Sequence, residues 1–167
     1  GHEEALLSED GMLETGKRQY SIEPFLRVNG KLLTWAEMNA SASMEWEPMP
    51  RPSVTLSNPG VSLRITTIAG WDTADPMVHV RYLVSSRDRS IRHATLYLVV
   101  RPFQVNPPWQ NIGFAGGTAR VQRVWREGDA VRVNDSAGFV CLPTPSAFGS
   151  CTLAEGEVVE RLRTGVI

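Results

Sequence analysis

The chain has 167 residues, of which 42% are hydrophobic and 21% are charged, a composition typical of a folded globular protein. This composition excludes a chain that is disordered throughout. The formal net charge is −1 and the basic residues are scattered, so we expect no nucleic-acid partner. A helix needs about 18 consecutive apolar residues to cross a bilayer, and no run in this chain approaches that length. The chain also shows no signal peptide, in which basic residues would precede an apolar stretch. We therefore expect no membrane partner and leave the cellular location open.

The first 18 residues are expected to form a flexible tail, with Gly1-His2 as the remnant of a cloning tag. The run "EEALLSEDG" favours either a short helical turn or a frayed end. From Gln19 onward, apolar and polar residues alternate, which is typical of strands. The runs "QYSIEPFLRVN" and "KLLTWAEM" meet at Asn29-Gly30, which predicts a hairpin because both turn positions need positive φ.

The alternation continues through the middle of the chain. One face of two later runs carries Val61, Leu63, Ile65 and Thr67, and then Val78, Val80, Tyr82 and Val84. The run "IRHATLYLVVR" has apolar residues on both faces, so we expect it to be a central strand that is covered on both sides. The runs "ARVQRVWRE" and "AVRVND" predict a further hairpin at Glu127-Gly128-Asp129.

Shorter strands are expected around Met44, Val54, Phe139 and Cys151, and a short helix is expected in "AEGEVVERLRTGVI". That last run has Val158, Val159 and Leu162 at helical spacing. It stops at Ile167 without a closing signal, so we expect a segment cut from a longer protein. Cys141 and Cys151 are expected as free thiols, with a disulfide across a hairpin as the alternative.

These patterns predict an all-β fold, a two-layer antiparallel β-sandwich of about ten or more strands with a short helix near the C-terminus. We expect three segments along the chain. They are a tail over residues 1–18, a sandwich domain over 19–154, and a helix or linker over 155–167 toward a following domain.

No reaction centre emerges from the residue patterns. There is no GxSxG, no zinc spacing and no phosphate-binding glycine loop, so we expect no catalytic residue, no metal and no cofactor. His79 and His93 lie in strand-like runs beside arginines, as solvated or core-edge histidines do. The candidates for a pair of catalytic carboxylates are Glu37, Glu45, Glu47, Asp72, Asp75 and Glu127, but their spacing brings no two of them together.

A recognition surface for sugars fits the sequence better, because sugars stack their C–H faces on aromatic rings and bind amides and charged groups through their hydroxyls. The run "RPFQVNPPWQ" offers Trp109 for stacking, with Arg101, Gln104, Asn106 and Gln110 for hydroxyl groups. Trp109 has a second interpretation, as a side chain that fills the core. Trp46 and Trp71 also lie beside acidic residues. We nevertheless expect Trp35, Trp46 and Trp125 to fill the core, because each alternates with polar neighbours.

The runs "IEPFLRVNGKLLTWAEM", "PMPRPSV", "LYLVVRPFQVNPPWQNIGFAGGTARV" and "GEVVERLRTG" resemble a segment of large bacterial proteins. Those proteins are described as glucosidase-like or, through an attached discoidin module, as coagulation factor 5/8 type. The resemblance covers residues 20–165, and RPFQVNPPWQ is its most specific part. It implies a galactose-mutarotase-like supersandwich domain that accompanies an (α/α) toroid. The catalytic acids of such proteins lie in the toroid, which this chain lacks, so no catalytic residue is transferred.

The expected function is therefore a non-catalytic carbohydrate-associated module of a glycoside hydrolase-like or phosphorylase-like protein. It would bind an oligosaccharide or pack against the other domains of its parent, with the RPFQVNPPWQ loop at the rim or seam. Two alternatives remain open. One is a purely structural scaffold between domains, or in a homodimer, without sugar binding. The other is a mutarotase-like or lyase-like enzyme, which requires histidines and acidic residues to converge in a concave cleft, with His79 and His93 as the usable histidines.

Overall fold

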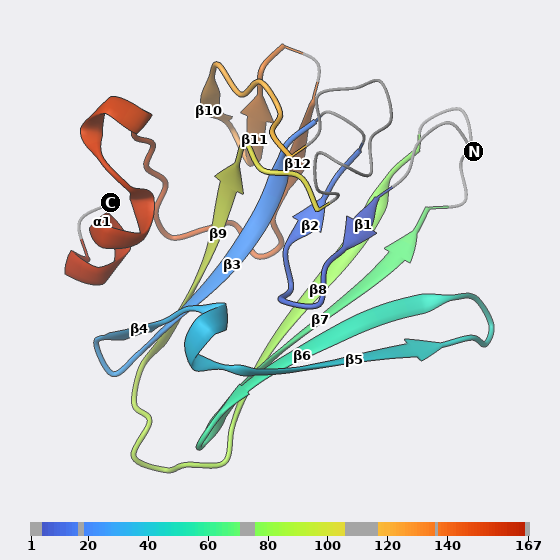
Figure 1. Ribbon diagram of the computed structural model, residues 1–167, viewed down its shortest axis with the longest axis vertical. Helices are drawn as coiled ribbons and strands as arrows, with labels where there is room; N and C mark the ends of the chain where they lie inside the picture. The colour runs from blue at the N-terminus through green and yellow to red at the C-terminus, as the bar shows by residue number, and fades with distance from the viewer. Residues whose placement is uncertain (1–4, 17–18, 71–75, 106–116, 136, 166–167) are drawn as a thin grey trace. The chain divides into compact units, whose positions relative to one another are not determined.

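The computed structural model describes residues 5–16, 19–70, 76–105, 117–135 and 137–165, and it consists mainly of antiparallel strands (Figure 1). The chain divides into two compact units, residues 1–119 and residues 120–167. The first unit holds the two layers of the sandwich. The expected sandwich domain over 19–154 therefore spans a boundary between units, and each unit is described by itself.

The first layer is a five-stranded sheet built around β3. Its strands are β1 (Leu6–Leu7), β2 (Leu13–Glu14), β3 (Ser21–Val28), β4 (Lys31–Leu33) and β9 (Ala94–Arg101). β3 pairs with β9 along its whole length, from Ser21 opposite Arg101 to Val28 opposite Ala94. β2 pairs with the start of β3, and β4 pairs with its end. The Asn29-Gly30 hairpin between β3 and β4 is confirmed, with φ values of 48° and 86°.

The expectation that the run containing β9 is the doubly covered central strand is wrong. β9 pairs with β3 alone among the described strands, and its side chains are half-buried or exposed. β3 takes the central place instead, since Phe25 on one face is 2% exposed and Leu26 on the other is 0% exposed. The apolar residues on both faces of β9 therefore did not show that it is a central strand, which would be paired along both of its edges.

The second layer is a four-stranded meander in the order β5-β6-β7-β8. Its strands are β5 (Asn39–Glu45), β6 (Arg51–Asn58), β7 (Val61–Ala69) and β8 (Val78–Ser86). A 3-10 turn, η1 (Trp35–Glu37), leads from β4 into β5. It begins with a capping box in which the Thr34 amide donates to Glu37 Oε2 at 2.8 Å and the Ala36 amide donates to Thr34 Oγ1 at 3.3 Å.

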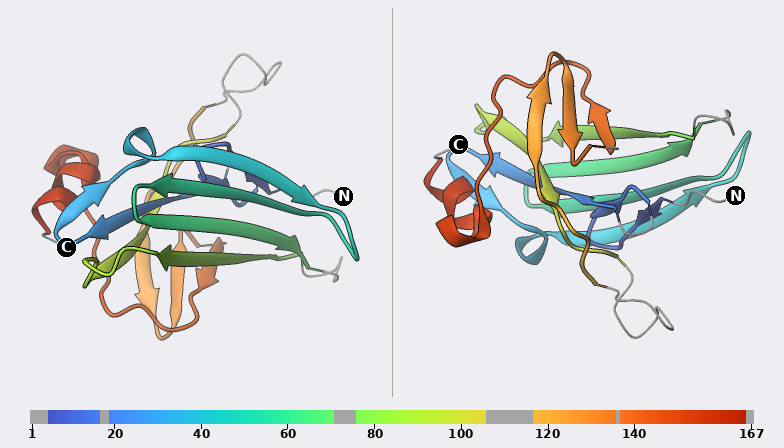
Figure 2. Two further views of the ribbon diagram at one scale, coloured as in Figure 1. Left: turned by 90° about the horizontal axis from the view of Figure 1, so that it is seen from below. Right: turned by 90° about the horizontal axis from the view of Figure 1, so that it is seen from above.

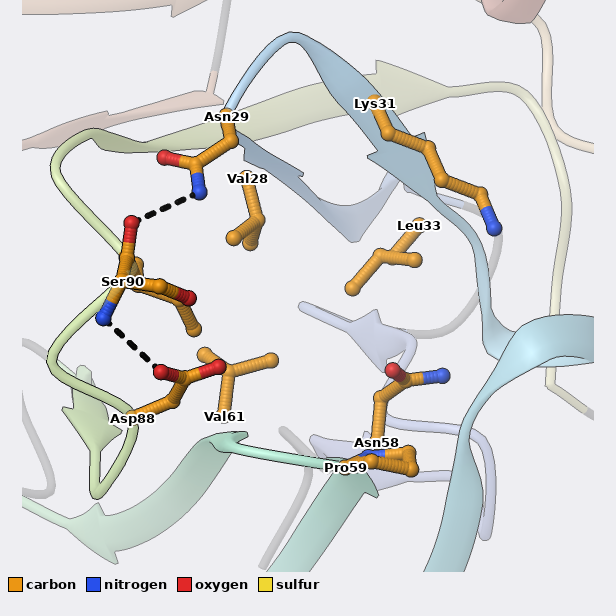
Figure 3. A pocket seen from close by; sticks show the side chains of 10 residues that line it. Val28, Asn29, Lys31, Leu33, Asn58, Pro59, Val61, Asp88 and Ser90 are labelled. Carbon is orange, nitrogen blue, oxygen red and sulfur yellow. Dashed lines mark hydrogen bonds between the residues drawn. The ribbon is translucent and has the colours of Figure 1, made fainter.

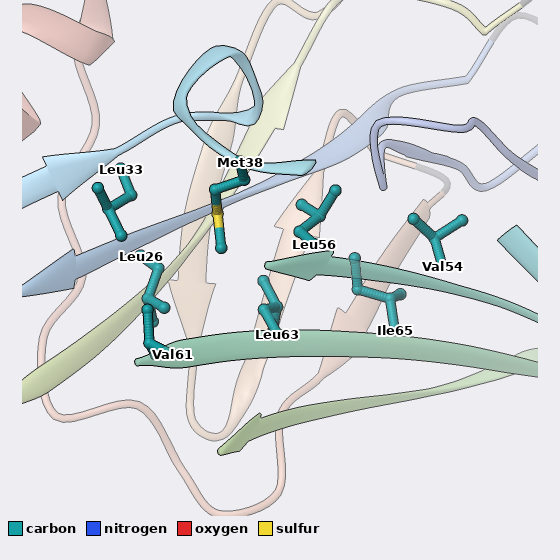
Figure 4. Packing of buried hydrophobic residues seen from close by; sticks show 8 residues of the cluster. All are labelled: Leu26, Leu33, Met38, Val54, Leu56, Val61, Leu63 and Ile65. Carbon is teal, nitrogen blue, oxygen red and sulfur yellow. The ribbon is translucent and has the colours of Figure 1, made fainter. Parts of the chain in front are cut away.

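The core lies between the two sheets (Figure 4). Its buried residues are Leu26, Leu33, Met38, Val54, Leu56, Val61, Leu63 and Ile65. β7 alternates buried and half-buried residues, as its sequence predicts. The corresponding residues of β8 are only half-buried. Together the two layers confirm the all-β sandwich.

The N-terminal segment, which was expected to be a tail, contains a hairpin. β1 pairs with β2, and Leu13 is 1% exposed. The turn is closed by the Ser8 amide, which donates to the Met12 carbonyl at 2.9 Å. Gly11 lies in this turn with φ of 84°, and an added Cβ would stand 2.6 Å from Cδ1 of Ile65. The hairpin therefore packs on the core, because its leucine supplies buried apolar surface that a tail would leave in water.

We expect Gly11→Ala to lower the free energy of unfolding by about 2 kcal/mol, because the alanine meets Ile65 and also adopts a positive φ. Gly30→Ala is the matched control, since Gly30 has φ of 86° and no atom lies within 4 Å of an added Cβ. The control should lose only the conformational part, about 1 kcal/mol. Urea unfolding of both variants measures the difference, and equal losses would show that the turn does not press on the core.

Two of the three tryptophans expected in the core are exposed instead. Trp35 is 52% exposed and Trp46 is 70% exposed. Trp125 is half-buried, with the Arg123 guanidinium 4.3 Å from its ring centroid. Trp35 and Trp46 flank β5, an edge strand on which every residue is exposed. Trp35 lies in the 3-10 turn η1 and Trp46 follows a strand whose residues are all exposed, so alternation with polar neighbours does not mark a core position.

The second unit contains a three-stranded meander, with β10 (Val124–Glu127), β11 (Ala130–Val133) and β12 (Ala137–Val140). The expected hairpin at Gly128-Asp129 is confirmed, since Glu127 pairs with Ala130. The expected C-terminal helix is α1 (Val158–Thr164), which ends at Gly165 with φ of 76°. No strand forms around Cys151, which precedes the 3-10 turn η3 (Leu153–Glu155). Cys141 and Cys151 are free and half-buried.

Candidate functional site

The predicted sugar-contacting loop is described only at its two ends. Arg101 and Gln104 belong to the described residues, whereas Asn106, Trp109 and Gln110 lie outside them. That these three residues contact a glycan therefore stays a prediction. Both interpretations of Trp109, stacking on a sugar or filling the core, also stay open. β9 ends at Arg101, immediately before Pro102, which has no amide hydrogen to donate to a sheet.

Arg101 is engaged by its own chain. It stands opposite Ser21 in the register of β3 and β9, so Glu23 is its diagonal neighbour on the same face. Arg101 Nε lies 3.3 Å from Glu23 Oε2, and the two side chains are only 12% and 14% exposed. The guanidinium also lies 4.7 Å from the ring centroid of Phe103. A sugar hydroxyl would have to compete with both contacts.

Gln104 takes part in closing the base of the loop. Its Nε2 donates to Glu14 Oε1 at 3.4 Å, and the Val105 amide donates to Glu14 Oε2 at 2.9 Å. Glu14 is 3% exposed, so its carboxylate has little contact with water. The two donors replace the hydrogen bonds that water would otherwise supply. A bridge between Phe103 and Thr118 joins the two ends of the loop. The structure therefore gives Arg101 and Gln104 an anchoring role.

A pocket with a different set of residues lies where three turns of the first unit meet (Figure 3). Those turns are the β3–β4 hairpin, the β6–β7 turn and the segment between β8 and β9. The cavity volume is about 180 Å³. It is lined by Val28, Asn29, Lys31, Leu33, Asn58, Pro59, Val61, Asp88, Ser90 and Ile91.

Asn29 fixes one wall of this pocket. It follows β3 in the left-handed conformation that asparagine tolerates. Its Nδ2 donates to the Ser90 carbonyl at 3.1 Å, while its Oδ1 accepts from the Arg92 amide at 3.0 Å and the His93 amide at 3.4 Å. One side chain therefore ties the β3–β4 hairpin to the segment that leads into β9.

Asp88 supplies a negative charge at the rim. Its Oδ1 accepts from the Ser90 amide at 2.8 Å, and hydrogen bonding to Ser90 lowers the pKa of Asp88 below its ordinary value. On the opposite side, Asn58 Nδ2 donates to the Glu37 carbonyl at 2.7 Å and ties the β6–β7 turn to η1. Lys31 is exposed and contributes the positive charge. Asn29 and Asp88 are thus held by bonds to the segment between β8 and β9, and Asn58 is held by a bond to η1.

The arrangement suits binding better than chemistry. Among the described lining residues, five apolar side chains lie beneath an amide, hydroxyl and charged rim, and Asp88 is the one carboxylate; the five are Val28, Leu33, Pro59, Val61 and Ile91. No group of three or more His, Cys, Asp and Glu side chains suited to a metal is found in the described part of the chain. The pocket therefore offers hydrogen bonds and an apolar surface but neither a pair of acids nor a metal centre.

His79 and His93 do not converge. His79 pairs with Ile68 near the start of β8, whereas the His93 amide bonds Asn29 beyond the end of that strand. Ser86 lies seven positions after His79 along β8, which corresponds to about 23 Å at ~3.3 Å per residue of an extended strand. The cleft that the enzymatic alternative requires is not formed by these two residues.

Sequence reasoning missed the pocket because its residues carry ordinary turn signals. Asn29-Gly30, Asn58-Pro59 and Asp88 each indicate a turn, and turns carry no information about which other turns lie beside them. The sequence did show that these residues lie in turns at the ends of strands. Which of the turns lie side by side follows only from the strand order, which the structure provides.

Comparisons with family models, with curated proteins and with solved structures find no match to this chain. The resemblance noted from the sequence thus remains an expectation. Among the described residues, no helix is both long and apolar enough to span a membrane.

Proposed function

We propose that the chain is a non-catalytic β-sandwich module that binds a sugar residue in the pocket between its turns and serves a larger carbohydrate-active protein. The observation that carries this proposal is the lining of the pocket. Val28 and Ile91, which are half-buried, offer an apolar surface to the C–H face of a sugar ring, and the buried side chains of Leu33 and Val61 lie behind them. Asn58, Ser90 and Asp88 offer acceptors and a donor to its hydroxyls.

The size of the pocket limits the ligand to about one ring. Its cavity volume is about 180 Å³. Sites for drug-sized ligands are larger, at about 300–1,000 Å³. We therefore expect a single sugar residue, such as the end of an oligosaccharide, to enter the pocket while the rest of the chain remains in solvent.

The hydrogen bonds of Asn29 and Asp88 support the proposal because they form the pocket before any ligand binds. Asn29 holds Ser90 through the Ser90 carbonyl, and Asp88 holds it through the Ser90 amide. A pocket that is already ordered loses less conformational entropy on binding. The separation of His79 and His93 also supports a binding role over a mutarotase-like or lyase-like activity.

Calorimetric titration with maltose and with cellobiose tests the proposal. We expect the whole chain to bind at least one of them, and Ser90→Phe to weaken that binding by about tenfold or more, which is about 1.4 kcal/mol. The phenyl ring would fill the pocket, and the two hydrogen bonds that hold Ser90 involve its main chain and survive the change.

Ser85→Phe is the matched control, because Ser85 is an exposed serine of β8 outside the pocket lining. It should bind as the unmodified chain does. Absence of binding to both sugars, or equal binding by Ser90→Phe and the unmodified chain, would contradict the sugar proposal.

A second candidate function, a structural scaffold without sugar binding, is favoured by the apolar residues that the fold leaves open. Val80, Tyr82 and Val84 of β8 pack against the core but stay half-buried, and Met44 and Trp46 at the opposite rim are 44% and 70% exposed. These residues leave apolar side chains partly open at both edges of the second sheet, and exposed apolar surface is typical of interaction sites where it is contiguous. A chain that binds no sugar but self-associates would favour this candidate.

A further inference from the structure

β5 is an open edge of the second sheet (Figure 2). It pairs with β6 at all seven of its positions, from Asn39 opposite Ser57 to Glu45 opposite Arg51. Its other side has no partner among the described strands. Every residue of β5 is exposed, so this strand offers a full row of unpaired main-chain groups.

Within β5 itself, the usual protections of an edge strand are missing. Proteins discourage pairing at edge strands with lysines, prolines, bulges or very short strands. β5 has the sequence NASASME and pairs with β6 in an unbroken register. Its one charge, Glu45, is already neutralised by Arg51 at 2.8 Å and Arg64 at 3.0 Å. The edge therefore presents small, uncharged side chains over most of its length.

One face of β5 continues the apolar layer of the sandwich. Ala40 stands opposite Leu56 and Ala42 opposite Val54, and both partners belong to the core. Ala40, Ala42 and Met44 consequently lie on the core-facing side of the sheet, yet they remain exposed. Trp46 follows them with the same parity and is 70% exposed. The apolar layer is thus left uncovered at this rim.

We propose that β5 pairs antiparallel with β5 of a second copy of this chain, around a two-fold axis at Ala42. The two four-stranded sheets then form one continuous sheet with their core-facing sides on the same face. The proposal is independent of sugar binding, since no residue of β5 lines the pocket.

The register follows from symmetry. Residues that face each other across two strands point to the same face of the sheet, so a two-fold axis perpendicular to the sheet pairs only positions of equal parity. Centring the axis on Ala42 is the one choice that pairs all seven residues of β5. Ala42 then faces its own equivalent, and Ala40 faces Met44 of the second copy.

The side chains of β5 complement themselves in this register. Ser41 faces Ser43, and Asn39 faces Glu45, so an amide donor meets the only carboxylate and no like charges come together. If the same register continues one position beyond the Asn39–Glu45 pair, Trp46 lies opposite Met38 of the second copy. This self-complementarity favours a second copy over an unrelated strand as the occupant.

Placing a positive or a negative charge at position 42 tests both the dimer and its register. We expect the whole chain to be dimeric by sedimentation at about 100 µM, a concentration well above a dissociation constant of about 1 µM. Ala42→Lys and Ala42→Glu should each be monomeric, because each places two like charges opposite one another. An equimolar mixture of the two variants should dimerise again, because lysine then faces glutamate. Recovery in the mixture also shows that both variants are folded.

Two further variants fix the geometry. Ala42→Cys in a Cys141→Ser, Cys151→Ser background should form a disulfide-linked dimer on mild oxidation, because residues that face each other across strands have Cβ atoms about 4.5–5.5 Å apart. Ser85→Cys on β8 in the same background should stay monomeric on a non-reducing gel. A monomeric unmodified chain, a dimeric Ala42→Lys variant, no recovery in the mixture, or no crosslink at position 42 would each overturn the proposal.

Discussion

Replacing Ile65 with alanine is expected to lower the free energy of unfolding by about 2–5 kcal/mol. Ile65 is 0% exposed and belongs to the core cluster between the two sheets. The Gly11 turn approaches its Cδ1 atom from the N-terminal hairpin. Truncation would remove apolar contacts and leave a cavity that strands pinned by their pairing on both sides fill poorly.

Leu83→Ala is the control for this prediction. Leu83 lies on the neighbouring strand β8 but points to the outer face and is 42% exposed, so its truncation should change stability by only about 0.5 kcal/mol. Urea unfolding compares the two variants. Similar losses for Ile65→Ala and Leu83→Ala would contradict the assignment of the core to the space between the two sheets.

Tyr20 should make the fold sensitive to alkali. Tyr20 is 2% exposed, and its burial raises its pKa from 10.0 to about 12, while its hydrogen bond with Thr15 acts in the lowering direction. The unfolded chain therefore loses the Tyr20 proton at lower pH than the folded chain. The contribution of Tyr20 to stability is fully present below pH 10 and is lost as the pH rises through about 12. The expected loss is about 2–3 kcal/mol.

Tyr20→Phe should abolish this part of the alkaline destabilisation. The comparison is between the free energies of unfolding at pH 9 and pH 12, measured with denaturant for the unmodified chain and the variant. Tyr97→Phe also removes a tyrosine hydroxyl, from the half-buried strand β9, and is the control for the substitution itself. A Tyr20→Phe variant that loses as much stability at high pH as the unmodified chain would contradict the burial of the Tyr20 hydroxyl.

Features of the fold that depend on a few neighbouring residues could be predicted from the sequence. The Asn29-Gly30 turn needs two positive φ angles, and the residues that supply them are adjacent in the chain. The alternation in β7 places Val61, Leu63 and Ile65 in the core because a strand alternates its side chains regardless of what lies beyond. Hairpins and inward faces were therefore predictable.

Strand order was not predictable, because it depends on pairing between segments far apart in the chain. β3 became the central strand through its pairing with β9, which lies about 70 residues later in the sequence. Trp46 and β5 lie at an edge that no local pattern distinguishes from an interior strand. A tryptophan that alternates with polar neighbours indicates a pleated strand but does not reveal whether another layer covers it.

The residues that line the pocket could not be predicted from the sequence. The sequence indicated a surface of amides and charged groups suited to sugars. In the structure, Arg101 and Gln104 contact Glu23 and Glu14, whereas the pocket gathers Asn29, Asn58 and Asp88 from three turns. Those three residues are separated by about 30 positions each, and only the folded sheets bring them together.

The most direct test of the proposed function is a titration of the ¹⁵N-labelled chain with maltose and cellobiose, followed through its amide resonances. Binding in the pocket predicts shifts at Asn29, Val61, Ser90 and Ile91 that saturate together, while the amides of β5 stay unchanged. Shifts confined to other surfaces, or no shifts with either sugar, would contradict a sugar site between these turns.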